Sequence, residues 1–199
     1  QKAFEKYGKD IACVIIEPVC GNMGVVLPKD SFLKTVQTLC HQNNSLLIFD
    51  EVMTGFRVHP GGAQGLWNLS PDITCLGKVI GGGLPCGALG GKASIMENLS
   101  PEGPVYQAGT LSGNPIVTAA GIGMLTKLKD PSVYTHLNKL SETLIQGLKE
   151  IIKKTKTPLQ LNHCGTMFSL FFSDKRIINL STAQGCDLSI FQAYHHHMM

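Results

Sequence analysis

The chain has 199 residues, of which 43% are apolar and 16% charged, so its composition is that of a folded globular protein and excludes intrinsic disorder. The formal charge of +3 is small and scattered, and no apolar run reaches the ~18 residues that span a bilayer, so we expect neither nucleic acid nor membrane as a partner. Seven cysteines without a CxxC pair indicate free thiols in a reducing compartment, which favours a cytoplasmic protein.

The first part of the chain predicts a strand, a helix and a second strand. Residues 11–18 (IACVIIEP) form a continuous apolar run, which is typical of a parallel strand covered on both faces. An amphipathic helix follows, with Asp30 or Ser31 as its cap. The strand 46–52 completes a βαβ unit, which implies a parallel pair with a right-handed crossover.

Two neighbouring apolar runs end in a charged residue. Asp50 closes the second strand, and Lys78 follows the third run, 73–76. Because ligands bind beyond the carboxyl ends of parallel strands, we expect both side chains to face one crevice. An amine that can form a Schiff base and an acid that can keep a ring nitrogen protonated favour a pyridine cofactor. Taken singly, Lys78 fits a surface lysine and Asp50 an ion pair with Arg57. Glu51 fits either a structural role or a role in supporting the site residues.

The glycine-rich surroundings of Lys78 do not match a known phosphate loop. A P-loop needs Ser or Thr after the lysine, where Val79 stands, and the dinucleotide pattern fails at Cys86. The stretch 54–71 is rich in glycine and proline, and connections of this length inside a compact domain are more often functional than filler. The surroundings therefore favour a functional lysine without a nucleotide fingerprint.

The later part predicts a fourth strand and two helices. Residues 87–91 (GALGG) read as the strand, with glycines that permit close approach of another backbone or a ligand. One helix begins near Asn114 and Pro115 and carries small residues that permit tight packing. A longer helix begins at Pro131 and keeps a helical spacing of leucines.

The last part of the chain changes character. Residues 159–172 alternate as strands do, so we expect residues 1–155 to belong to a large domain and 156–199 to begin a small C-terminal domain. The triplet His195–His197 fits a natural surface helix or a tag remnant better than a metal site, because adjacent helix residues do not face one another. We predict no metal.

Four stretches together resemble the class III aminotransferases, a group of the fold-type I pyridoxal-phosphate enzymes. They are IIEPVCGNMGVVLP, LLIFDEVMTGFRV, PDITCLGKVIGGGLPCGALGG and GPVYQAGTLSGNP. The resemblance runs through residues 11–172. It implies a three-layer α/β/α fold with a mostly parallel sheet, plus the start of a small α+β domain. Within the group, the chain is similar to the glutamate-1-semialdehyde 2,1-aminomutases.

Two positions carry the similarity to the aminomutases. Aminotransferases of this class usually have Glu in the turn after Glu-Pro and Gln two residues after Asp-Glu, whereas Asn22 and Met53 stand there in this chain. Met53 cannot donate a hydrogen bond, so the resemblance assigns the contact with the phenolic oxygen of the cofactor to Asn22. It implies an isomerase that converts glutamate-1-semialdehyde to 5-aminolevulinate for tetrapyrrole (porphyrin) synthesis by intramolecular amino transfer.

The resemblance also implies the roles of the residues at the strand ends. Lys78 holds pyridoxal 5'-phosphate as a Schiff base and moves the proton between cofactor and substrate, with the pyridoxamine form in the cycle. Asp50 hydrogen-bonds and charges the pyridine nitrogen. Val52 packs against one face of the ring.

The loop before the Asn114 helix is implied to serve a second subunit. Gly109 and Thr110 resemble the residues that reach the phosphate of the neighbouring subunit's cofactor, and Tyr106 lines the same site. The resemblance therefore implies a homodimer with shared active sites that acts on a small molecule. It also implies a transient contact with the tRNA-dependent reductase that supplies the aldehyde.

Other parts of the family's site have no counterpart in this sequence. The main phosphate loop, the aromatic residue on the other ring face and the arginine for the substrate carboxylate would precede Gln1. We therefore expect a piece of a longer protein, inactive and weak in cofactor binding by itself. Two alternatives stay open: a class III aminotransferase that uses an external amino donor, and a non-catalytic α/β module that binds a nucleotide or a partner.

Overall fold

The computed structural model describes all 199 residues and divides them into two compact units. The first unit comprises residues 1–18 and 29–131, and the second comprises residues 19–28 and 132–199. The predicted domain boundary after residue 155 stays a prediction. None of the helices combines the length and the apolar character that crossing a membrane demands.

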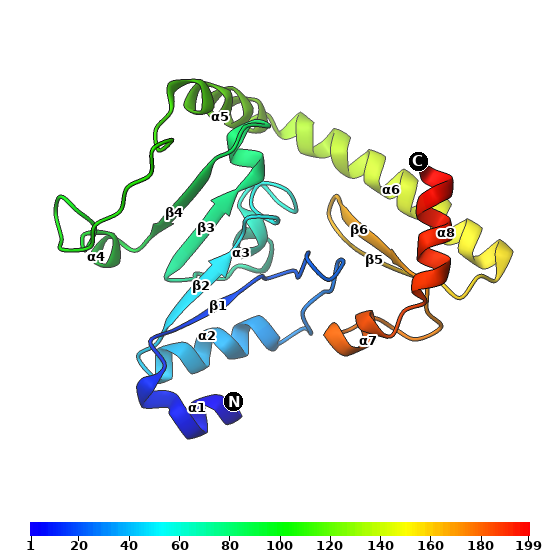
Figure 1. Cartoon of the computed structure of the whole chain (residues 1–199), viewed down its shortest axis with the longest axis horizontal. Helices are drawn as coiled ribbons and strands as arrows, with labels where there is room; N and C mark the ends of the chain where they lie inside the picture. The colour runs from blue at the N-terminus through cyan, green and yellow to red at the C-terminus, as the bar shows by residue number, and fades with distance from the viewer. The chain divides into compact units, whose positions relative to one another are not determined.

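The first unit is built on a four-stranded sheet in the order β1-β2-β3-β4 (Figure 1). The strands are β1 (Cys13–Ile16), β2 (Leu46–Asp50), β3 (Ile73–Gly77) and β4 (Gly87–Gly91). The helices are α1 (Lys2–Tyr7), η1 (Gly8–Asp10), α2 (Phe32–Gln42), α3 (Gly62–Trp67), η2 (Lys78–Gly81), α4 (Ala93–Met96) and α5 (Pro115–Leu128). The first three strands are parallel, and β4 runs antiparallel to β3. The predicted βαβ unit is therefore confirmed, with α2 as its crossover.

The core of this unit lies between α2 and one face of the sheet. Leu47 and Phe49 of β2 are completely buried, because alternate residues of a strand point to the same face. Asp50 therefore belongs to the opposite face. The buried cluster consists of Leu33, Cys40, Leu47, Phe49 and Leu69. Trp67 of α3 packs against it.

Strand β1 is less buried than its sequence predicted. Val14 and Ile16 pack against the core, but Cys13 is exposed and Ile15 is 62% exposed. The prediction of a strand covered on both faces is therefore wrong for this structure. The physical reason is that β1 lies at the edge of the sheet, and the apolar cluster with α2 covers only one of its faces.

Helix α5 packs closely against η2, the short helix that begins at Lys78. A Cβ atom on Gly121 would lie 2.5 Å from the carbonyl oxygen of Ile80. One on Gly82, which has φ +59°, would lie 2.6 Å from the carbonyl oxygen of Ala120. The small residues of this helix thus permit the predicted tight packing, and the packing fixes the segment that follows Lys78.

A buried carboxylate joins β2 to the segment after β4. Asp72 is 4% exposed, accepts a hydrogen bond from the backbone N–H of Leu47 at 2.7 Å and forms an ion pair with Lys92 at 2.5 Å. Burial by itself raises the pKa of Asp72, but the Leu47 N–H and the Lys92 ammonium outweigh it and hold that pKa below its ordinary value.

This carboxylate predicts a loss of stability in acid. The stabilisation is complete above the unfolded pKa of ~3.9 and is lost as the pH falls through the lowered folded pKa. Asp72→Asn should reduce the free energy of unfolding by about 1–3 kcal/mol near pH 7, because the Leu47 N–H and Lys92 lose a charged acceptor. Urea unfolding near pH 7 and in acid measures both effects, with the exposed Glu97→Gln as the control. An acid dependence that survives unchanged in Asp72→Asn would contradict the assignment.

The second unit combines a long helix with a hairpin. Its elements are α6 (Pro131–Thr155), β5 (Gln160–Cys164), β6 (Met167–Phe171), α7 (Leu180–Gln184) and α8 (Leu188–Met198). The hairpin is antiparallel, and Asn162 donates side-chain hydrogen bonds to the carbonyl oxygens of Val25 and Ile177. The histidine triplet lies exposed on α8, and no group of three or more potential ligands in the chain could hold a metal ion.

Candidate active site

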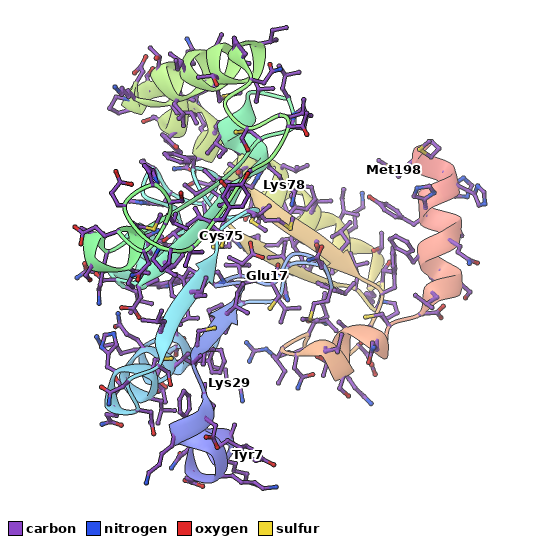
Figure 2. The ribbon with its side chains drawn as sticks, turned by 60° about the vertical axis from the view of Figure 1, so that its left-hand side comes forward. Tyr7, Glu17, Lys29, Cys75, Lys78 and Met198 are labelled. Carbon is purple, nitrogen blue, oxygen red and sulfur yellow. The ribbon has the colours of Figure 1, made fainter.

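Asp50 and Lys78 lie at the carboxyl ends of adjacent parallel strands. Asp50 is the last residue of β2, and Lys78 directly follows the last residue of β3. Asp50 is in register with Cys75, so Lys78 lies three residues further along, roughly 10 Å in the strand direction. Figure 2 shows Cys75 and Lys78 near this end of β3. The two predicted residues therefore share one edge of the sheet.

The carboxylate of Asp50 is oriented by the backbone that follows it. Its Oδ1 accepts a hydrogen bond from the N–H of Val52 at 3.0 Å. Burial, and then the negative charge of Asp50, raise the pKa of the Cys75 thiol. The carboxylate and the thiol therefore lie near one another, and Oδ2 of Asp50 is left to accept a hydrogen bond from a ligand.

Lys78 adopts an unusual backbone conformation. Its φ is +46°, in the left-handed region that costs a residue other than glycine about 1–2 kcal/mol. The side chain is exposed, and its ammonium forms no ion pair within the chain. Backbone strain at a charged residue without a local partner is typical of functional sites.

Val52 contacts the residue that precedes Lys78. A Cβ atom on Gly77 would lie 3.2 Å from Cγ1 of Val52, so the glycine makes room for the isopropyl group. An amine, a carboxylate and an apolar side chain thus gather at one edge of the sheet. This donor set fits an aromatic ring that carries an aldehyde and a basic nitrogen: the amine suits the aldehyde, the carboxylate the nitrogen and the valine a ring face.

The other predicted site residues belong to other segments of the chain. Tyr106, Gly109 and Thr110 belong to an exposed loop between α4 and α5, and Tyr106 is 82% exposed. The N–H of Ser112 donates to the carbonyl oxygen of Gly109 at 2.9 Å, which closes a turn in the loop. No hydrogen bond joins these three residues to Asp50 or Lys78. Asn22 is exposed and belongs to the second compact unit, so its predicted contact with the cofactor stays a prediction.

Glu51 is more deeply embedded than its sequence position indicated. The side chain is 1% exposed, and its carboxylate accepts hydrogen bonds from the hydroxyl of Thr54, the N–H of Ala63, and both the backbone and the side chain of Gln64. These hydrogen bonds confirm the structural role, one of the two roles predicted for Glu51. The sequence analysis did not identify Thr54, Ala63 and Gln64 as its hydrogen-bond partners. The only sequence signal for this network was the position of Glu51, a second acid beside Asp50, directly before a glycine-rich connection.

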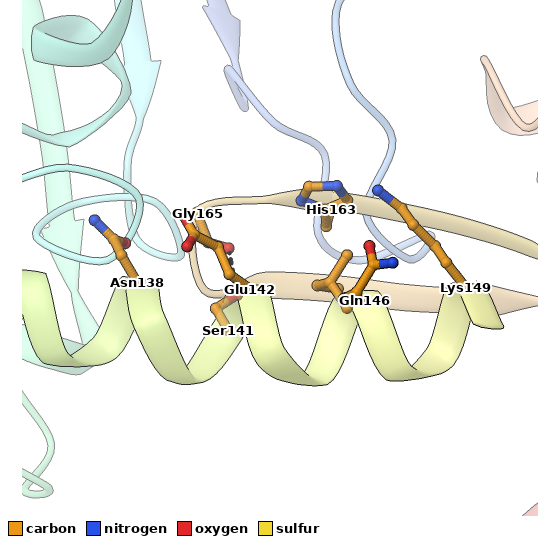
Figure 3. Close-up of a pocket in the computed structure, with 8 residues that line it drawn as sticks. Asn138, Ser141, Glu142, Gln146, Lys149, His163 and Gly165 are labelled. Atoms are coloured by element: carbon orange, nitrogen blue, oxygen red, sulfur yellow. Dashed lines mark hydrogen bonds between the residues drawn. The ribbon is translucent and has the colours of Figure 1, made fainter. Parts of the chain in front are cut away.

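The second unit has an open cavity of its own, of about 390 Å³, beside helix α6 and the β5–β6 hairpin (Figure 3). Its wall includes Glu142 and Lys149 of the helix and His163 of the hairpin. Burial, and then the charge of Lys149, lower the pKa of His163, so its imidazole is neutral at physiological pH. The hydroxyl of Ser141 donates to the carbonyl oxygen of Gly165 at 2.9 Å. This cavity contains none of the predicted site residues.

A sheet with an amine and a carboxylate at the same strand ends defines a pyridine-cofactor type of site, and comparison with known proteins gives the family. A sequence model of the class III aminotransferases matches residues 1–195. The chain therefore belongs to the class III aminotransferase family.

Its relatives among curated proteins are more specific. The chain is 54% identical to a glutamate-1-semialdehyde 2,1-aminomutase of Clostridium kluyveri over 98% of its own length and 47% of that protein. It is 53% identical to glutamate-1-semialdehyde 2,1-aminomutase 2 of Oceanobacillus iheyensis, over 99% of this chain and 46% of the relative. The chain thus spans about half the length of the curated relatives it matches.

Solved structures confirm the expected fold class. A β-phenylalanine aminotransferase from Variovorax paradoxus superposes with a TM-score of 0.87 at 32% identity, over 94% of this chain and 43% of that one. A glutamate-1-semialdehyde aminomutase from Pseudomonas aeruginosa in complex with PMP has a TM-score of 0.80 at 25% identity, over 90% of this chain and 42% of that one.

Proposed function

We propose that this chain carries the catalytic lysine and the ring-binding aspartate of a pyridoxal-phosphate-dependent aminomutase that converts glutamate-1-semialdehyde to 5-aminolevulinate for tetrapyrrole synthesis. The observation that carries the proposal is the joint placement of Asp50 and Lys78 at adjacent strand ends, with Val52 against Gly77. The 54% identity to a curated aminomutase supports this particular reaction within the family.

Each residue of the cluster has a distinct task. When bound, pyridoxal phosphate supplies an aldehyde that takes up amino groups and a ring that withdraws electrons. The Nζ atom of Lys78 binds that aldehyde and, once released, accepts and returns a proton as a general base and acid. Asp50 holds a positive charge on the ring nitrogen through Oδ2, while the N–H of Val52 fixes its Oδ1. The side chain of Val52 supports one face of the ring.

The reaction is proposed to be intramolecular because of two residues. Asn22 and Met53 stand where the resembling aminotransferases carry Glu and Gln, and this pattern matches the aminomutases. A thioether cannot donate a hydrogen bond to the phenolic oxygen, whereas the amide of Asn22 can. The amino group then moves from C2 to C1 of the same substrate, with no outside donor.

The exposed loop supports a homodimer with shared active sites. Tyr106 is 82% exposed, Leu111 65% and Ile116 73%, an unusual amount of bare apolar surface that a second subunit would cover. Gly109 and Thr110 lie between Tyr106 and Leu111 in the sequence, and their resemblance to the family's residues implies that they would reach the partner's phosphate site. All seven cysteines are free thiols, which supports a cytoplasmic location, where the reductase that makes the substrate would contact the dimer.

The reaction can be tested in a full-length context. We expect a chimera, in which this chain replaces the matching stretch of the Clostridium kluyveri relative, to form 5-aminolevulinate from glutamate-1-semialdehyde without an added amino donor. The 199-residue chain by itself is expected to show no turnover. The measurement is a colorimetric assay of 5-aminolevulinate in the presence of pyridoxamine phosphate.

Two results would favour the alternatives. Efficient amino transfer from common donors to keto acids, with no 5-aminolevulinate formed, would favour an ordinary aminotransferase. Borohydride reduction that leaves Lys78 unmodified under cofactor saturation, as read by peptide mass spectrometry, would favour a non-catalytic binding module.

A further inference from the structure

Glu51 directly follows Asp50 but serves the opposite face of the sheet. Successive residues of an extended segment point to opposite faces, and Glu51 accordingly lies buried on the side away from the Asp50 carboxylate. A buried carboxylate is retained only where its charge is matched by hydrogen-bond donors. None of the hydrogen-bond partners of Glu51 is a cation, so the neutral donors of the following loop stabilise its buried negative charge.

The carboxylate closes the loop 54–65 on itself. Oε2 accepts from the hydroxyl of Thr54 at 2.9 Å and from the N–H of Ala63 at 2.6 Å, and Oε1 accepts from the N–H of Gln64 at 2.9 Å. Gly62 has φ +65°, and a Cβ there would overlap the carboxylate. Both ends of the loop are thus held by one side chain.

The backbone of Glu51 carries this constraint to Asp50. The N–H of Glu51 donates to the carbonyl oxygen of Cys75 at 2.9 Å, and its own carbonyl oxygen accepts from the N–H of Gly55 at 2.8 Å. The resulting turn contains Val52, whose N–H holds Oδ1 of Asp50 at 3.0 Å. A change at the Glu51 carboxylate therefore reaches the Asp50 carboxylate through a single short turn.

A second connection runs to β3, the strand that ends directly before Lys78. The side chain of Gln64 donates to Oε1 of Glu51 at 3.2 Å and to the hydroxyl of Thr74 on β3 at 3.2 Å. Glu51 therefore ties together the two strands whose ends present the carboxylate and the amine.

We propose that Glu51 is a positioning residue of this site: its buried carboxylate fixes the turn that orients Asp50 and Val52 and ties this turn to β3, the strand that directly precedes Lys78. The proposal rests on the proposed function. Glu51 touches none of the reacting atoms, and its effect is exerted through the N–H of Val52.

The test compares two buried carboxylates that both hold β2. In Glu51→Gln the new NH₂ group faces hydrogen-bond donors such as the N–H of Ala63, so hydrogen bonds to the loop 54–65 are lost. In Asp72→Asn the lost acceptor lies near Leu47, at the other end of β2. The measurement is hydrogen exchange at the backbone amide of Val52, with the amide of Phe49 as the internal reference. We expect the relative exchange rate of Val52 to rise about tenfold in Glu51→Gln and not in Asp72→Asn. A tenfold rise corresponds to the loss of about one hydrogen bond.

A second readout involves the cofactor. In the full-length chimera, pyridoxal phosphate is titrated by its visible absorption. Glu51→Gln is expected to weaken the apparent affinity about tenfold and to shift the pH midpoint of the absorption band by about one unit. Asp72→Asn is expected to lower stability and leave the midpoint unchanged, so a merely structural effect is separated from positioning.

The outcomes distinguish the two proposals. A band that titrates identically in the parent and in Glu51→Gln, together with unchanged exchange at Val52, would overturn the positioning role and leave the function intact. A midpoint that shifts equally in both variants would also overturn it, since general destabilisation would then suffice. Absence of any cofactor band in the unsubstituted chimera would overturn the proposed function itself.

Discussion

Replacing Lys78 with glycine is expected to stabilise the fold and to abolish the reaction. Lys78 has φ +46°, which glycine adopts without a steric penalty, and its exposed side chain contributes no ion pair. The free energy of unfolding should therefore rise by about 1 kcal/mol in urea unfolding of the 199-residue chain. Opposite changes in stability and activity are typical of a residue that is kept for function.

The loss of activity follows from the chemistry of the amine. In the proposed site, Nζ of Lys78 binds the cofactor aldehyde and moves the proton, so its removal should lower turnover of the chimera by at least about 10²–10⁴-fold. Borohydride reduction should no longer leave a pyridoxyl group on the peptide that contains position 78. Formation of 5-aminolevulinate and peptide mass spectrometry measure the two effects.

Two further variants make the result specific. Lys78→Ala removes the amine but keeps a Cβ atom, so it should lose activity without the gain in stability. Lys127→Ala, at an exposed lysine of the last turn of α5, should change neither. Full activity in Lys78→Gly, or a pyridoxyl group found on another lysine in the unsubstituted protein, would contradict the assignment.

The elements near the site could be predicted from the sequence because their signals are local. Apolar runs located the first three strands of the first unit, and a glycine-rich run located the fourth. Asp50, which closes the second apolar run, is the last residue of β2, so this strand ends two residues before its predicted end at 52. Asn114 was predicted at the start of α5, and its side chain accepts hydrogen bonds from the N–H groups of Ile116 and Val117. Each of these features depends on residues only a few positions apart.

The features that the sequence did not reveal depend on distant residues. Ile15 is exposed because no helix covers its face of the sheet. An apolar run in the sequence does not show which elements will pack against each face of the strand. The hydrogen bonds of Glu51 to Ala63 and Gln64 join residues 12 and 13 positions apart through an irregular loop in which two residues, Phe56 and Gly62, have positive φ. The hydrophobic periodicity of the sequence does not predict such a contact.

The same distinction applies to the candidate site. Asp50 and Lys78 were predicted together because parallel strands bring their carboxyl ends to one edge, a rule of topology. Asn22, Gly109 and Thr110 were assigned only through a family resemblance. The proposed roles of these residues would involve the second compact unit or a second subunit, so they stay predictions.

Asp50→Asn is expected to keep the shape of the site while removing its charge. The amide oxygen of Asn can still accept the hydrogen bond from Val52, so the stability should change by no more than about 1 kcal/mol. In the proposed site the ring nitrogen would lose its charged partner, so turnover should fall about 10²–10³-fold, in the range for removal of one preorganised electrostatic contact. Loss of the Asp50 charge should also lower the pKa of the Cys75 thiol toward its ordinary value, because that charge is one of the two causes that raise it. The rate of Cys75 alkylation against pH, read by mass spectrometry in the cofactor-free protein, reports this change independently of activity. A variant that titrates Cys75 at lower pH yet turns over at the parent rate would show that the carboxylate is correctly placed but takes no part in the reaction.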